Sequence, residues 1–300
     1  MDEKNDIKTR FFDMFEVKSK SAQSLYDSLK ECITSKGIPF ENLVGFSSDT
    51  TNAMVGEHNS VFSHLKQESP YIACIKCSCH MIHLAASKAC LNLPKHVEDL
   101  LRNLGAHFNR SYGRQLAFKE FQEFFRVEIH KILSPAATRW LSLKACVDRV
   151  LEQYEPLKAY LREACFEDPS YTIQTMFDTM DNQFTKVYLE FMSYVLGILV
   201  DFNLLFQSDK PLLHQLKPQV EKMLKDICSN FIDMKYLKKT HILEVQHAEP
   251  RIQLPYNKLY LGVAASESLH DLQQNTAVEA KDIDHFFKSI LKFILNLLVW

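Results

Sequence analysis

The sequence contains little glycine and little net charge, and its most apolar stretch is too short to span a bilayer. Glycine occurs 7 times in 300 residues, which favours long helices over a turn-rich all-β fold. The net charge of -2 excludes a global basic field, so any binding of DNA would depend on a local patch. The most apolar stretch, residues 191–200, stops at Asp201, which favours a core helix and predicts no interaction with a membrane.

Several common catalytic motifs are also missing. The chain has no Gly-rich phosphate loop, no Gly-x-Ser-x-Gly nucleophile turn and no His-Glu-x-x-His zinc motif. What it does contain is enough apolar sequence for a sizeable core, since hydrophobic residues make up 46%. Eight cysteines without a secretory leader predict a reducing compartment, the nucleus or the cytoplasm.

The pattern of apolar residues predicts an α/β region followed by an all-α region. Over about the first 90 residues we expect strands at 9–17, 43–46 and 71–78, alternating with helices at 19–36 and 52–66. Ser21 is the expected cap of the first helix and Gly37 its expected stop. Beyond this, apolar residues at three- and four-residue spacing predict helices over 91–108, 115–129, 141–165, 184–206 and 212–231, and then an irregular connection over 239–264. Pro156 is expected to bend or divide the helix at 141–165.

Asp49 follows the predicted strand at 43–46 and has two interpretations. A carboxylate at the end of a buried strand can ligate a catalytic metal, but two-metal catalysis needs several carboxylates around ions about 4 Å apart. The alternative is that Asp49 caps the next helix with help from Thr50 or Thr51.

Five metal-ligating side chains crowd into residues 74–83: Cys74, Cys77, Cys79, His80 and His83. Zinc fingers separate two ligand pairs by a dozen or so residues, and adjacent residues of a strand point to opposite faces. We therefore predict no metal here. Cys77 and His80 are instead expected to be structural residues, buried and hydrogen-bonded at a strand-to-helix junction.

Arg139 and Trp140 follow a proline-containing break and open a predicted helix. An arginine beside an indole can hold a phosphate while the ring stacks on an unpaired base, and such stacking contributes about 1–3 kcal/mol per base. The alternative is a core tryptophan with an ion-paired arginine. Basic residues are frequent between residues 95 and 139, but interspersed acidic residues favour a solvated helical surface.

Three ordered motifs resemble the central part of a hAT-superfamily DNA transposase. The run from Gly45 to Gly56 resembles the segment of the second catalytic aspartate with its Asn-x-Met, and the run from Cys77 to Leu84 resembles the Cys-x-x-His segment. The run from Thr138 to Ser142 resembles the Thr-Arg-Trp-x-Ser motif. Residues 204–211 resemble a segment of domesticated members, the zinc-finger MYM-type and BED-type hAT-like proteins. The resemblance covers roughly residues 8 to 295.

The resemblance implies an RNase H-like domain interrupted by a large helical insertion, with an Asp-Asp-Glu triad that uses Mg²⁺ or Mn²⁺. We accordingly expect a partial RNase H-like region over residues 1–145 and a helical insertion over 146–300, truncated before the C-terminal catalytic and dimerisation segment. Asp49 matches the second acid, as a remnant inactive alone, and Trp140 matches the aromatic residue that stacks on a flipped base. The first acid is expected before Thr9 and the glutamate after the insertion, so two of the three acids are missing from this chain.

The sequence supports one main hypothesis and two rivals. The main one is a catalytically inactive, transposase-derived nuclear protein without a cofactor, which binds nucleic acid, a protein partner or both. The first rival is a protein-interaction module, because the apolar tail over residues 286–300 would favour self-association into a homo-oligomer if uncovered. The second is a truncated reading frame without function, whose exposed strand edges would aggregate.

Overall fold

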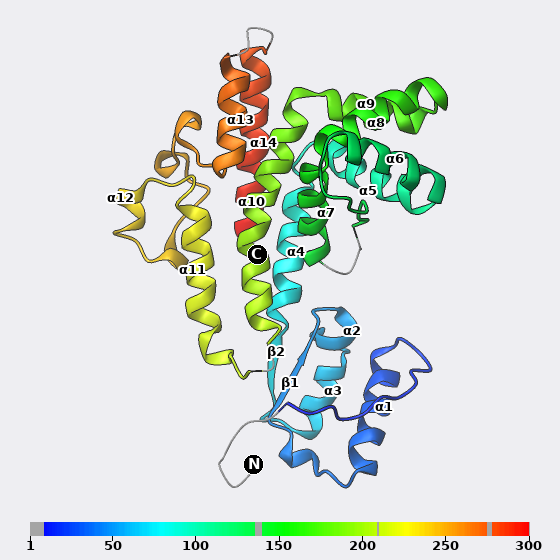
Figure 1. Cartoon of the computed structure of the whole chain (residues 1–300). Coiled ribbons are helices and arrows are strands. Elements are labelled where there is room, and N and C mark those ends of the chain that lie inside the picture. The colour runs from blue at the N-terminus through cyan, green and yellow to red at the C-terminus, as the bar shows by residue number, and fades with distance from the viewer. Residues whose placement is uncertain (1–8, 136–139, 209, 275–277, 300) are drawn as a thin grey trace. The chain divides into compact units, whose positions relative to one another are not determined.

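The computed structural model describes residues 9–135, 140–208, 210–274 and 278–299 (Figure 1). These residues are mostly helical and include one small parallel sheet, which agrees with the predicted combination of an α/β region and an all-α region. The chain divides into two compact units. The first contains residues up to 84 and residues 203–214, and the second contains residues 85–202 and 215–300. The boundary predicted at residues 145/146 divides an RNase H-like region from a helical insertion. It rests on the family resemblance and stays a prediction.

The first unit is built on two parallel strands joined by a helical crossover. Strand β1 (Gly45–Ser48) pairs with β2 (Ala73–Lys76), with Gly45 opposite Ala73 and Ser48 opposite Lys76. Parallel neighbours need a crossover. The crossover contains α2 (Asn52–Val55) and α3 (Val61–Glu68). Helix α1 (Ala22–Ser35) precedes β1, and α4 (Ser78–Cys90) follows β2. A 3-10 turn, Phe40–Asn42, precedes β1.

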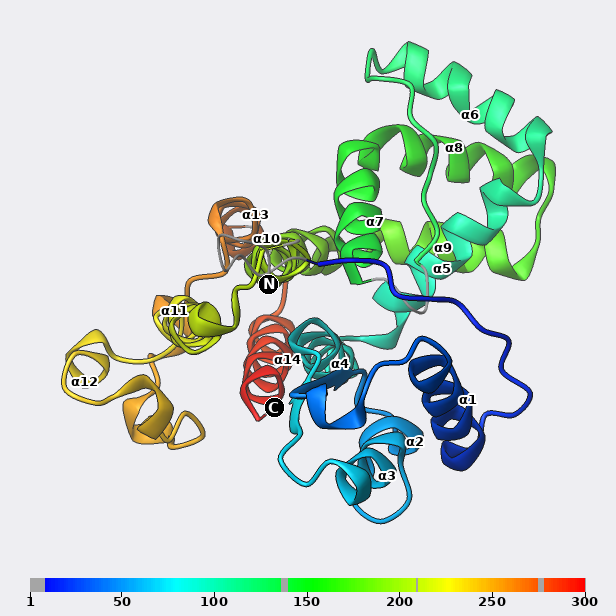
Figure 2. The ribbon, with the colours of Figure 1, turned by 90° about the horizontal axis from the view of Figure 1, so that it is seen from below.

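The core of this unit lies between α1, α3 and the sheet, which are neighbours in Figures 1 and 2. Tyr26 of α1, Val61 and Leu65 of α3, and Ile72 are its buried centre, against which Phe46 of β1 packs. Burying such side chains contributes about 1.5–3 kcal/mol each, which holds the strands and the crossover together.

Sequence signals place the helix ends of this unit. The Ser21 side chain accepts a hydrogen bond from the backbone of Ser24, as the predicted cap of α1. Gly37 follows α1 with φ +66°, a conformation that glycine adopts without steric cost. The predicted helix over 52–66 is interrupted after Val55, and Ser60 with Ser63 forms a capping box that starts α3.

The strand predicted over residues 9–17 is wrong. These residues form neither strand nor helix, and Phe11 and Met14 are more than four-fifths exposed. A strand needs a partner for its backbone groups, and β1 and β2 pair only with each other among the described residues.

The second unit is helical. Helices α5 to α9 pack against one another, mainly through the pairs α5–α6, α5–α9, α6–α8 and α8–α9. Their bounds are α5 (Lys95–Asn109), α6 (Tyr112–Phe124), α7 (Trp140–Glu152), α8 (Tyr154–Glu167) and α9 (Tyr171–Asp181). The predicted helix over 141–165 is divided at Gln153, and Pro156 lies in the first turn of α8, where a proline is tolerated.

Five further helices follow α9 in the described residues. They are α10 (Gln183–Phe206), α11 (Leu216–Cys228), α12 (Met234–Leu237), α13 (Val263–Gln274) and α14 (Ala280–Leu298). A 3-10 turn, Leu213–Gln215, precedes α11. The predicted irregular connection over 239–264 contains three short 3-10 turns, at Ile242–Glu244, Pro250–Ile252 and Tyr256–Lys258.

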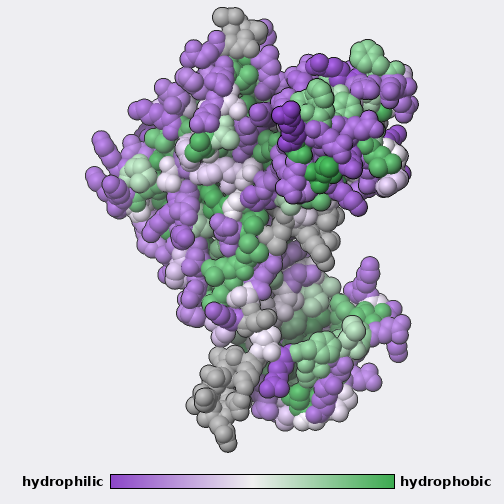
Figure 3. Space-filling view, viewed as in Figure 1, coloured by the Kyte–Doolittle hydropathy of each residue, from purple (hydrophilic) through white to green (hydrophobic). Residues whose placement is uncertain are grey.

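The apolar side chains of α14 are covered by the chain itself. Phe293 of α14 is fully buried and meets Phe191 of α10 edge to face, with ring centroids 5.4 Å apart. Tyr188 and Phe286 make a second contact between these helices, at 4.8 Å. Figure 3 shows mostly hydrophilic side chains over α13, on the outside of this group. Most of the described part of the apolar tail is therefore covered, and self-association stays a prediction.

Helix α10 is, by length and composition alone, able to cross a membrane. Its most apolar 18-residue stretch has a mean hydropathy of 1.6, yet half of that stretch is buried inside the protein. The ring contacts with α14 favour the predicted core helix over a membrane segment.

Candidate functional site

Asp49 and the Cys-x-x-His segment lie at the same edge of the parallel sheet. Asp49 directly follows β1, and Cys77 directly follows β2. The backbone N–H of Cys77 donates a hydrogen bond to the carbonyl oxygen of Ser48, at 2.9 Å. The crossover that contains α2 and α3 separates these two motif segments along the sequence. The pairing of the strands makes them adjacent in space.

The Asp49 carboxylate organises the turn before α2. Its Oδ1 accepts hydrogen bonds from the side chain and the backbone N–H of Thr51, at 2.7 and 3.0 Å. These two bonds hold the pKa of Asp49 below its usual value, and the nearby His80 adds to the effect. Thr51 is itself the N-cap of α2. Asp49 therefore does not cap α2 itself, as the capping interpretation has it. Its carboxylate holds the N-cap residue Thr51, whose own side chain makes no capping hydrogen bond.

The cysteine and histidine cluster forms the predicted strand-to-helix junction. Cys77 and His80 are half-buried, which is less than the buried state expected for them. Cys79 Sγ lies 3.8 Å from the carbonyl oxygen of Asn203, and burial raises the pKa of its thiol. Burial lowers the pKa of His83, whose ring stacks on His80 with centroids 5.9 Å apart. A thiol with a raised pKa stays protonated, which disfavours a reactive cysteine at position 79.

The third motif lies mostly outside the described residues. Arg139 is not among them, and neither is the side chain of Trp140. The backbone of Trp140 begins α7, as predicted for the helix after the proline-containing break. The roles expected for these two residues stay predictions.

Several basic residues between positions 95 and 131 are ion-paired. Arg102 binds Glu98 at 2.6 Å, and Lys119 lies 3.4 Å from Glu123, each one helical turn away. Exposed pairs of this kind contribute about 0–1 kcal/mol. They favour the predicted solvated surface over a phosphate-binding patch.

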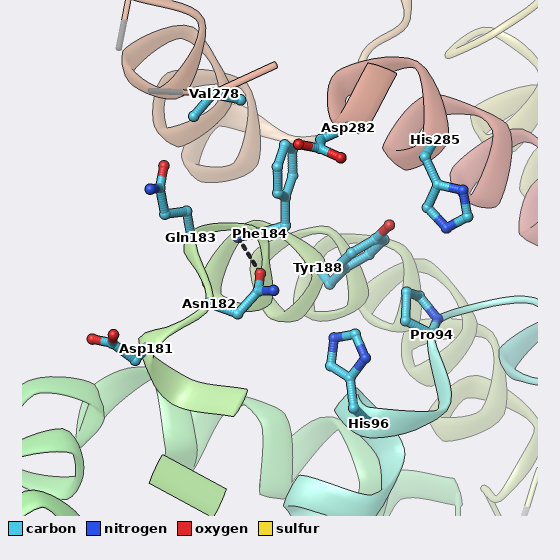
Figure 4. Close-up of a pocket in the computed structure, with 10 residues that line it drawn as sticks. All are labelled: Pro94, His96, Asp181, Asn182, Gln183, Phe184, Tyr188, Val278, Asp282 and His285. Atoms are coloured by element: carbon cyan, nitrogen blue, oxygen red, sulfur yellow. Dashed lines mark hydrogen bonds between the residues drawn. The ribbon is translucent and has the colours of Figure 1, made fainter. Parts of the chain in front are cut away.

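A pocket of about 560 Å³ lies where the start of α10 meets α5 and α14 (Figure 4). His96 and His285 extend toward the same space from opposite sides, and Asp282 lies beyond Phe184. Burial lowers the pKa of His96. The described residues that line the pocket include carboxylates but neither lysine nor arginine, so it is poorly suited to a phosphate group.

One group of side chains that could hold a metal ion was not predicted from the sequence. Glu128, His130 and Glu152 each offer a ligand atom, and these atoms lie within 4.8 Å of one another. The Glu-x-His spacing puts two of them on one side of an extended segment. The third comes from the end of α7, and sequence spacing gives no signal for it.

Comparisons with known proteins do not assign the chain to a family. No protein-family model matches it. No solved structure matches it either.

Proposed function

We propose that this chain is derived from a hAT-like transposase and binds nucleic acid without cutting it. The observation that carries the proposal is the adjacency of Asp49 and the Cys77–His80 segment at the carboxyl edge of the sheet. In open α/β sheets this edge is where ligands bind. The RNase H-like ancestry of the unit belongs to the same proposal.

The proposed absence of cleavage follows from the chemistry of phosphodiester hydrolysis. Two-metal catalysis requires several carboxylates that converge on ions about 4 Å apart. Asp49 is the one acid that the resemblance assigns to this chain, and one of its oxygens already binds Thr51. Arg139 and Trp140 would supply binding, through a phosphate contact and base stacking.

The test is binding of short single-stranded and branched DNA to the purified chain, followed by fluorescence anisotropy across salt concentration. Trp140→Ala is compared with Tyr171→Ala, which removes an aromatic side chain that is 89% exposed on α9. Binding that weakens with salt and with Trp140→Ala alone supports the proposal. A folded chain that binds neither DNA contradicts it and favours a protein-interaction module.

Cleavage is tested separately. We expect no nicking of supercoiled DNA with Mg²⁺ or Mn²⁺. Nicking that disappears in Asp49→Asn would show an active enzyme and contradict the proposed loss of catalysis.

A further inference from the structure

The group formed by Glu128, His130 and Glu152 joins two separate segments of the helical unit. Glu128 and His130 lie in the extended stretch after α6, and Glu152 is the last residue of α7. His130 Nδ1 is 2.6 Å from Glu152 Oε1, and His130 Nε2 is 3.3 Å from Glu128 Oε1. Each ring nitrogen therefore lies near a different carboxylate oxygen, and one of the two nitrogens is available to an ion shared by the three residues.

The size of the group suits a small divalent cation. Zinc binds nitrogen and carboxylate oxygen at about 2.0–2.2 Å in a tetrahedral arrangement, so its ligand atoms lie about 3.3–3.6 Å apart. The three ligand atoms lie within 4.8 Å of one another, so the side chains would have to rotate toward a common point to bind one ion. The Glu128 side chain is 79% exposed, which leaves room for water to complete the coordination.

The backbone that carries two of the ligands is fixed by buried side chains. The Gln122 amide donates to the carbonyl of His130, and the Gln153 amide donates to the carbonyl of Glu128, both at 2.9 Å. Both glutamines are buried. A backbone held in this way presents its side chains at small entropic cost.

Arg149 orients the third ligand. Its Nε lies 3.0 Å from Glu152 Oε2, which leaves Oε1 directed toward His130. Carboxylates that bind metals are commonly hydrogen-bonded in this manner. The Arg149 charge also opposes a cation, so the expected affinity is moderate.

We propose that Glu128, His130 and Glu152 bind one first-row divalent cation, of which Zn²⁺ is the physiological choice. Imidazole with carboxylate suits Zn²⁺, Co²⁺ and Ni²⁺ better than Mg²⁺ or Ca²⁺. The ion would tie the extended stretch to the end of α7. This site is independent of the proposed binding of nucleic acid.

The test is a Co²⁺ titration of the metal-free full chain, followed by visible absorption, with Zn²⁺ as the competitor. We expect one Co²⁺ per chain with the weak visible bands of nitrogen and oxygen ligands. An intense near-ultraviolet band would place the ion on cysteine thiolates and overturn the proposal. Absence of Co²⁺ binding would overturn it too, and leave an ion-pair network only.

Two variants separate metal binding from folding. His130→Ala removes the central ligand, and Glu128→Gln changes an exposed side chain that no packing depends on. We expect each to weaken binding by more than about 10-fold, with an unchanged circular dichroism spectrum, because even the loss of a residue behind the ligands costs about 10–100-fold. Glu155→Gln and His270→Ala, both exposed in the same unit, should bind as the wild type does. Equal affinity in all four variants would contradict the assignment.

Discussion

The side-chain amide of Gln122 donates a hydrogen bond to the side-chain carbonyl of Gln153, at 2.8 Å, in the interior of the helical unit. Each glutamine also binds a backbone carbonyl of the extended stretch after α6. The pair thus holds together α6, the junction of α7 with α8, and the stretch that carries Glu128 and His130.

Gln153→Leu is expected to lower the free energy of unfolding by about 2 kcal/mol or more. The change removes one acceptor of the Gln122 amide and the donor to the Glu128 carbonyl, and each unsatisfied buried group costs about 1–3 kcal/mol. Urea unfolding measures the effect. In a double-variant cycle with Gln122→Leu, the two losses should not add, because the residues share one bond. Strict additivity would contradict the network.

His107 should make the stability depend on pH below neutrality. Its Nε2 lies 2.9 Å from the Tyr160 hydroxyl, and burial lowers its pKa to about 4. The ordinary pKa of histidine is 6.5, so between pH 6.5 and about pH 4 the unfolded chain binds a proton at His107 that the folded chain does not. The free energy of unfolding is therefore unaffected by this ring above pH 6.5 and decreases as the pH falls through this window.

His107→Gln should flatten the dependence of unfolding free energy on pH, by up to about 3 kcal/mol across the window. The exposed His270 provides the control, His270→Gln, which should leave the curve unchanged. Equal curves for wild type and His107→Gln would show that this ring titrates alike in both states.

Glu190 is expected to cost stability at neutral pH. Its side chain is buried on α10, its Oε2 has no hydrogen-bond partner among the described residues, and burial raises the pKa of its carboxyl. Because the folded pKa lies above the unfolded one, the penalty is absent at low pH and develops as the pH rises. Glu190→Gln should raise the free energy of unfolding by about 1 kcal/mol at about pH 8 and by less at about pH 5. An exposed control, Glu155→Gln, should do neither.

Phe293→Ala should be among the most destabilising changes in α14. The ring is fully buried against Phe191, and truncating a core phenylalanine costs about 3–5 kcal/mol. Val299→Ala, at a side chain that is 71% exposed, should stay within about 0.5 kcal/mol of wild type. Similar effects of the two changes in chemical denaturation would mean that α14 does not pack as described.

Local signals predicted much of the secondary structure. Ser21 and Gly37 marked the ends of α1, because capping and positive φ act within a few residues. Pro156 marked the division between α7 and α8. The strand at residues 9–17 was wrong because aromatic composition indicates a strand but does not supply a partner for it.

Which of the candidate site residues lie close together in the folded chain could be predicted only in part. Asp49 and Cys77 each follow a strand, so a parallel sheet brings them to one edge. Glu152 meets His130 only because α7 packs back along the stretch after α6, and no periodicity encodes that return. The apolar tail suggested an uncovered surface, whereas α10 packs against α14 in the described part of the tail.

The anisotropy of labelled single-stranded DNA, measured with the wild type and Trp140→Ala over a salt series, tests the proposed function most directly. We expect salt-sensitive binding that Trp140→Ala weakens and Tyr171→Ala does not. A folded chain without affinity for DNA, or equal affinities in all three proteins, would contradict the proposed binding of nucleic acid.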